Sequence, residues 1–76
     1  MLERLLEILS EVRPDLDFEN ETHLIDDDLL DSFDIISIVS ECNDVFDVEI
    51  SVDDLEPENF NSAEAIAALI ERLQED

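Results

Sequence analysis

Residues 32–47 read SFDIISIVSECNDVFD, and this stretch decides the fold. Its apolar side chains recur at the spacing of an α-helix, with about 3.6 residues per turn. They form one stripe, which consists of Ile35, Ile38, Val39, Cys42, Val45 and Phe46. Although its β-branched residues favour strands locally, both the period and the length predict an amphipathic helix that buries this stripe.

Toward the N-terminus, the chain predicts another amphipathic helix and then a long connection. Residues 2–13 carry apolar side chains at helical spacing, namely Leu2, Leu5, Leu6, Leu9 and Val12. Pro14 disfavours the helical conformation at the residue before it, so this helix should end near Arg13. Residues 15–31 form a connection whose length is uncommon in compact domains and is often functional. Its apolar residues indicate that it is pinned to the core.

Toward the C-terminus, a short helix and a longer one are expected. Residues 51–55 open like a helix N-terminus, with Ser51 at the cap position and acids in the first turn. Pro57 follows closely and predicts that this third helix is short. We expect Asn61 to cap the last helix, with Glu64 at the capping-box position. Three longer helices and one short third helix predict an all-α fold, a small four-helix bundle.

The charge of the chain excludes whole classes of function. Of the 76 residues, 24 are Asp or Glu and 3 are Arg, which gives a formal net charge of −21. Such a surface repels nucleic-acid phosphates and anionic membranes, and no apolar run approaches the roughly 20 residues of a spanning helix. The length suits a single domain over residues 1–76. The lack of Gly excludes Gly-rich phosphate-binding loops.

Residues that could support catalysis or metal binding are few. Cys42 lies within the apolar stripe and His23 lies in a polar connection, so we expect a core thiol and a solvated imidazole. A single cysteine excludes an intramolecular disulfide and, without a signal-peptide pattern, favours the cytoplasm. The run Asp26–Asp28 with Asp31 lacks the glycine and spacing of a calcium loop, so no dedicated metal site is expected. A small aliphatic core offers no pocket for a catalytic carboxylate pair, so we expect no enzyme.

Ser32 is informative because of its surroundings. A serine at a helix start is a common N-cap, and capping is its simplest role. On a helical wheel, Phe33 lies almost opposite the apolar stripe and Ile36 lies close to Ser32. Two exposed apolar side chains beside a serine, ringed by acids, predict a docking face for a partner. We define the docking face as Asp31, Phe33, Asp34, Ile36, Glu41 and Asp44.

Residues 29–50 read LLDSFDIISIVSECNDVFDVEI and resemble the centre of acyl carrier proteins, around the Asp-Ser-Leu motif at the start of their second helix. The succession of helix, long loop, Asp-Ser helix, short helix and last helix extends the resemblance over most of the chain. The resemblance implies that a phosphopantetheinyl transferase attaches 4′-phosphopantetheine to Ser32 from coenzyme A. The thiol of that arm would hold an acyl group as a thioester, so the protein would be a non-catalytic, stand-alone carrier.

The resemblance also implies partners. Acids along the helix would steer enzymes that have basic patches, namely a loading ligase and downstream synthases or transferases. The carrier would act as a monomer, for example in fatty acid biosynthesis and lipid metabolism.

The cargo stays open at this point. Ser37 and Asn43 stand where carriers of fatty acid synthesis usually place acids, and the stretch LEPENFNS lengthens the link before the last helix. These features also suit aminoacyl carriers, including the D-alanyl carrier of teichoic acid modification.

Hypotheses from other classes make different use of the same residues. An acidic helical domain could bind a basic protein surface through Phe33 and Ile36 without any prosthetic group, and the Ser32 hydroxyl would then be dispensable. A metal-responsive acidic module would instead bind calcium stoichiometrically.

The cations also lie far from Ser32 in the sequence, at Arg4, Arg13 and Arg72. Since Asp31 and Asp34 should repel a phosphate, we expect a phosphopantetheine arm to be held by its covalent bond alone and to stay mobile.

Overall fold

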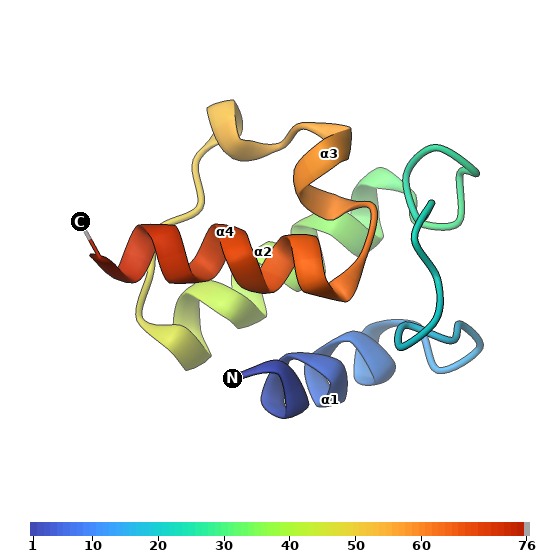
Figure 1. The fold of residues 1–76 in the computed structure, drawn as a ribbon, viewed down its shortest axis with the longest axis horizontal. Helices are drawn as coiled ribbons and strands as arrows, with labels where there is room; N and C mark the ends of the chain where they lie inside the picture. Colours follow the sequence, from blue (N-terminus) through green and yellow to red (C-terminus); the bar gives the residue numbers. More distant parts are fainter. Residues whose placement is uncertain (76) are drawn as a thin grey trace.

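Four α-helices and one 3-10 turn make up the secondary structure of the computed structural model, which describes residues 1–75 (Figure 1). In chain order they are α1 (Leu2–Val12), α2 (Ser32–Phe46), the 3-10 turn η1 (Val52–Asp54), α3 (Pro57–Phe60) and α4 (Ala63–Glu75). No strand occurs among these 75 residues. The all-α prediction, with three longer helices and a short third one, is confirmed.

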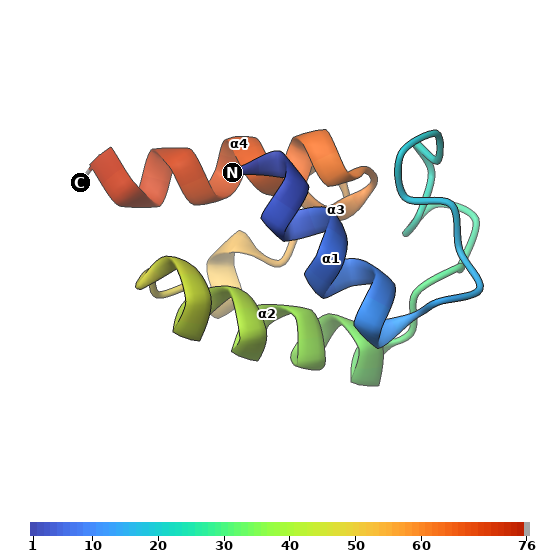
Figure 2. The same cartoon turned by 90° about the horizontal axis from the view of Figure 1, so that it is seen from below.

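The helices pack in a way that leaves the start of α2 at one end of the molecule. α2 and α4 run in roughly the same direction, as both views show (Figures 1 and 2). α1 runs obliquely across them and packs against both, whereas α3 packs against α4 on the opposite side (Figure 1). The long connection between α1 and α2 lies at the same end of the molecule as the start of α2 (Figures 1 and 2).

One hydrophobic core joins the helices to this connection. Leu5 and Leu9 of α1, Ile38 of α2 and Ile66 of α4 are fully buried within it. The connection contributes a further three buried side chains, at Phe18, Leu24 and Leu30. Burying a side chain of this size stabilises a fold by about 1.5–3 kcal/mol. The expectation that the connection is pinned to the core is therefore confirmed.

Cys42 is a core residue, as the sequence predicts. Its side chain is completely buried and belongs to the same hydrophobic cluster. Burial raises the pKa of the Cys42 thiol to about 11, and the nearby charge of Glu41 acts in the same direction. The thiol is therefore neutral near pH 7, which does not suit a nucleophile.

The third helix forms later in the chain than the sequence predicts. Residues 51–55 contain only the 3-10 turn η1, which Ser51 and Asp54 close as a capping box. Pro57 was expected to end a helix, but it occupies the first turn of α3. Proline suits that position because its fixed φ is helical and its missing N–H has no helical partner there. The stretch LEPENFNS, which was expected to lengthen the link before the last helix, therefore contains α3.

Asn61 does not cap α4, contrary to the prediction. The cap is Ser62, whose hydroxyl accepts a hydrogen bond from the backbone N–H of Ala65 at 3.0 Å. Asn61 instead fastens the long connection: its side-chain oxygen accepts from the backbone N–H groups of Ile25 and Asp26 at 3.0 and 3.1 Å. Serine and asparagine are both good caps, so their adjacent positions do not reveal from sequence which of them caps the helix.

Candidate functional site

The first turn of α2 is held by a reciprocal pair of hydrogen bonds. The side chain of Asp31 accepts from the backbone N–H of Asp34 at 2.9 Å, and the side chain of Asp34 accepts from the backbone N–H of Asp31 at 3.3 Å. This capping box satisfies two of the donors that a helix start leaves open. Asp31 is thus the N-cap, so the capping role first considered for Ser32 is wrong.

Ser32 is therefore free of a structural task. It is the first residue of α2, and it is exposed. No hydrogen bond among residues 1–75 involves its hydroxyl, and the backbone N–H groups of Ser32 and Phe33 also lack partners within this part of the chain. Unpaired N–H groups at the positive end of a helix dipole favour an anion. An exposed hydroxyl beside two such donors suits the attachment of a phosphate ester.

Arg13 reaches this helix start from the end of α1. One of its terminal nitrogens, Nη1, lies 2.7 Å from Oδ2 of Asp34 and 2.9 Å from the backbone oxygen of Leu29. The Nε and Nη2 groups donate to both carboxylate oxygens of Asp15, at 3.0 and 2.9 Å. Because Arg13 and Ser32 are far apart in the sequence, the sequence alone did not predict that this cation lies beside the start of α2. Arg13 thus pairs with Asp34, one of the two acids that were expected to repel a phosphate. The expectation that the arm is held by its covalent bond alone stays a prediction.

The guanidinium of Arg13 also sets the charge state of its surroundings. Hydrogen bonds to Asp15, and then to Asp34, raise the pKa of Arg13 further above its usual range. The hydrogen bonds that Arg13 donates to Asp15 lower the pKa of that carboxyl below its ordinary value. At neutral pH, Asp34 therefore faces a permanent positive charge rather than open solvent, and only 15% of its side chain is exposed.

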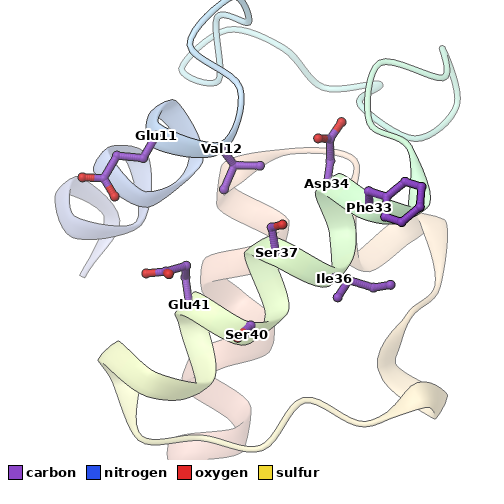
Figure 3. Close-up of a pocket in the computed structure, with 8 residues that line it drawn as sticks. All are labelled: Glu11, Val12, Phe33, Asp34, Ile36, Ser37, Ser40 and Glu41. Carbon is purple, nitrogen blue, oxygen red and sulfur yellow. The ribbon is translucent and has the colours of Figure 1, made fainter.

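Two large apolar side chains close to Ser32 on α2 are exposed. Phe33 is 80% exposed and Ile36 is 62% exposed, as the helical wheel predicts. They border a shallow groove of about 550 Å³, lined by Glu11 and Val12 of α1 and by six residues of α2. Figure 3 shows Ser37 and Glu41 on the side of α2 toward α1, with Phe33 and Ile36 on the other side.

The structure also places the acids of the docking face. Asp31, Glu41 and Asp44 are exposed, whereas Asp34 is occupied by its ion pair with Arg13 and by the capping box. Five of the six docking-face residues are thus accessible to a partner.

A family model described as a phosphopantetheine attachment site matches residues 3–70. The chain belongs to this family. No curated protein matches the chain. As a member, the carrier has an attachment site for a covalent 4′-phosphopantetheine group, and the predicted cofactor class is confirmed. Domains of this family are generally non-catalytic and work with modifying enzymes and synthases.

The residues of this carrier fit the group at the start of α2. The exposed Ser32 hydroxyl lies there beside two backbone N–H groups that have no partner within residues 1–75. The Asp34 carboxylate is paired with Arg13. When bound, the group supplies a mobile arm that ends in a thiol.

None of the helices in residues 1–75 has the length and apolar character needed to cross a bilayer.

Three side chains with metal-ligating atoms lie close together in the long connection between α1 and α2. Glu21, His23 and Asp27 bring one ligand atom each to within 4.8 Å of one another. Asp27 belongs to the run Asp26–Asp28 that the sequence singled out, whereas Glu21 and His23 lie outside that run. His23 is exposed, as predicted, and one of its ring nitrogens lies 3.2 Å from the hydroxyl of Thr22. The cluster consists of exposed or half-buried loop side chains, which are common without a metal.

Proposed function

We propose that Ser32 is the attachment point of the phosphopantetheine arm and that this protein is an acyl carrier, which presents acyl thioesters to partner enzymes. The observation that carries the proposal is the exposed Ser32 hydroxyl, which makes no hydrogen bond in residues 1–75 because Asp31 caps the helix in its place. Among the other serines, those at 51 and 62 are engaged in turn or cap hydrogen bonds. Asp31 and Ser32 also stand at the start of α2, where the chain resembles the Asp-Ser-Leu motif of acyl carrier proteins.

The attachment step needs a nucleophilic oxygen that an enzyme can reach. A transferase would bring coenzyme A to the start of α2, and the Ser32 oxygen would form a bond to the phosphorus of the pantetheine arm. The bond from that phosphorus to the adenosine bisphosphate breaks, and the hydroxyl proton is lost to a base or solvent. The N–H groups of Ser32 and Phe33 would then stabilise the remaining negative charge on the phosphate.

Partner enzymes would approach along the exposed part of the docking face. Phe33 and Ile36 supply apolar contact area, and Asp31, Glu41 and Asp44 supply charge that attracts basic patches. Contacts of this size should be weak, which suits a shuttle that has to leave each enzyme. The large negative charge also favours a monomer, and a reducing cytoplasm suits the single, buried Cys42.

An aminoacyl cargo, such as D-alanine, is the second candidate. Asn43 favours it, because this residue replaces an acid that fatty acid carriers usually present. Its side-chain oxygen accepts from the backbone N–H of Ile50 at 3.0 Å, so it stabilises the exit of α2 instead of extending the acidic face. Loading the modified carrier with an acyl ligase or with a D-alanyl ligase, followed by intact mass, distinguishes the two cargoes.

The attachment site is tested by modification in vitro. The purified chain is incubated with coenzyme A, magnesium and a broad-specificity phosphopantetheinyl transferase, and the product is analysed by intact mass and fragment mapping. We expect the gain of one phosphopantetheine on Ser32, and none with Ser32→Ala. Ser37→Ala and Ser40→Ala are matched controls, since both serines are exposed on the same helix, and both variants should be modified normally.

The contrary outcome is equally informative. No gain on a folded chain, with a known carrier modified in parallel and a second transferase tested, would overturn the proposal. An acidic domain that docks through Phe33 and Ile36 without a prosthetic group would then explain the exposed face.

A further inference from the structure

We propose that Arg13 is a positioning residue of the attachment site: its guanidinium joins the end of α1, the long connection and the capping box of α2, and so orients the turn that presents Ser32. The inference rests on the proposed attachment at Ser32. It means that Arg13, although distant from Ser32 in the sequence, affects the rate at which the phosphopantetheine arm is attached.

The contacts of Arg13 carry this inference. Nη1 bridges two elements, since it donates both to the Leu29 backbone oxygen in the connection and to the Asp34 carboxylate in α2. Asp15 holds the opposite edge of the guanidinium through two further bonds, which fixes the orientation of its plane. Arg13 is 29% exposed and Asp34 is 15% exposed, so the pair is shielded more than a surface ion pair. Such an arrangement holds one geometry rather than many.

The link from Arg13 to Ser32 runs through Asp34. The oxygen of Asp34 that contacts Arg13 also accepts from the backbone N–H of Asp31, and Asp31 in turn accepts from the backbone N–H of Asp34. Ser32 and Phe33 lie between these two residues in the chain. A shift of the Asp34 carboxylate therefore shifts the turn that carries the Ser32 hydroxyl and the two unpartnered N–H groups.

Arg13 also lowers the electrostatic cost of bringing a phosphate to this turn. The chain has 24 acids and only 3 arginines. In the part of the chain that the structure describes, Arg4 pairs with Glu7 and Arg72 contacts Asn59, so neither is engaged at the start of α2. Without Arg13, the Asp34 carboxylate would face the incoming phosphate unneutralised.

The test compares two arginine variants as substrates of the transferase. Arg13→Met should lower kcat for transfer to Ser32 by on the order of tenfold, because a misplaced hydroxyl is less often aligned to attack the phosphorus within the bound complex. The KM for the carrier should stay within about twofold, since every exposed side chain of the docking face is retained. Arg4→Met removes the same charge from α1, the helix that Arg13 follows, and should leave both constants unchanged.

The split between kcat and KM separates positioning from a loss of stability. The carrier is the substrate in this assay, so partial unfolding would reduce the folded concentration and raise the apparent KM without changing kcat at saturation. Arg13→Lys keeps a positive charge within reach of Asp34 and should recover most of kcat, although lysine cannot hold Asp15 and Asp34 with the same planar geometry. If circular dichroism shows that Arg13→Met is unfolded, Arg13→Gln replaces it under the same criteria.

The outcomes distinguish this inference from the proposed function. If the wild-type chain is not modified on Ser32, the proposed function fails. If the wild type is modified but Arg13→Met has the kcat of Arg4→Met, or raises KM alone, the positioning role of Arg13 is overturned and the attachment site stands.

Discussion

Asp31 and Ser32 are neighbours with different tasks, and their substitution should have different consequences. Asp31→Ala removes the N-cap and half of the capping box, so it should lower the free energy of unfolding by about 1 kcal/mol. Ser32→Ala removes an exposed hydroxyl that makes no hydrogen bond in the described chain, so its effect should stay within about 0.5 kcal/mol. Urea unfolding followed by circular dichroism measures both changes.

A large loss of stability in Ser32→Ala would contradict this division of tasks. It would also weaken the use of that variant as a test of modification, because loss of the fold would then explain a loss of labelling. Asp31→Asn is the matched control, since asparagine caps a helix about as well as aspartate and should retain most of the stability.

At the scale of single residues, the sequence predicted which side chains are exposed or buried better than it predicted which residues contact each other. The helical period alone placed Phe33 and Ile36 on the outside and Cys42 in the core, and all three predictions are confirmed. Arg13 was missed because its contact with Asp34 spans 21 residues and depends on the path of the long connection. A rare cation beside a proline in a strongly acidic chain was the only available signal.

At the scale of elements, Asn61 shows how the long connection is attached to the helices. Its side-chain oxygen accepts from two backbone N–H groups of the connection, its side-chain nitrogen donates to Asp26 at 3.2 Å, and its backbone oxygen accepts from Leu24 at 2.9 Å. Asn61→Ala leaves two backbone donors without this acceptor. It should therefore lower the free energy of unfolding by about 1–3 kcal/mol, as urea unfolding would show.

A matched asparagine controls for the type of substitution. Asn20 lies in the same connection but is exposed, and its side chain donates only to the neighbouring Asp17 carboxylate. Asn20→Ala should change stability by less than about 0.5 kcal/mol. Equal losses in the two variants would show that Asn61 does not fasten the connection.

The elements themselves were predictable where the pattern is long and periodic. α1, α2 and α4 each repeat an apolar stripe over about three turns or more. The bounds of α1 and α2 agree closely with the predicted ones, whereas for α4 only the start was predicted. The third helix was misplaced because four residues hold too little pattern, and because proline can either begin or end a helix. The cap of α4 was assigned one residue too early, since the tertiary contacts of Asn61 outweigh its capping preference.

At the scale of the whole molecule, charge repulsion opposes the packing of the core. The formal net charge of −21 is spread over a body of only 31 × 23 × 20 Å. The Debye length is about 30 Å at 0.01 M salt and about 10 Å at 0.1 M. Nearly every pair of acids therefore interacts at low salt, whereas only near neighbours interact at physiological salt. Stability should depend on ionic strength more than it does in a protein of balanced charge.

Raising NaCl from about 10 mM to about 200 mM should accordingly raise Tm, and KCl at equal ionic strength should act alike. Acidification from neutral pH should also raise Tm at first, because protonation of exposed carboxylates relieves repulsion. The gain then reverses: Asp15, whose pKa the Arg13 hydrogen bonds lower, adds stability above its ordinary value of 3.8 and loses it as pH falls through the lower folded-state pKa. Thermal melts over pH and salt test this balance. A Tm unchanged by salt would contradict it, whereas a saturable rise with calcium at constant ionic strength would indicate a specific metal site instead.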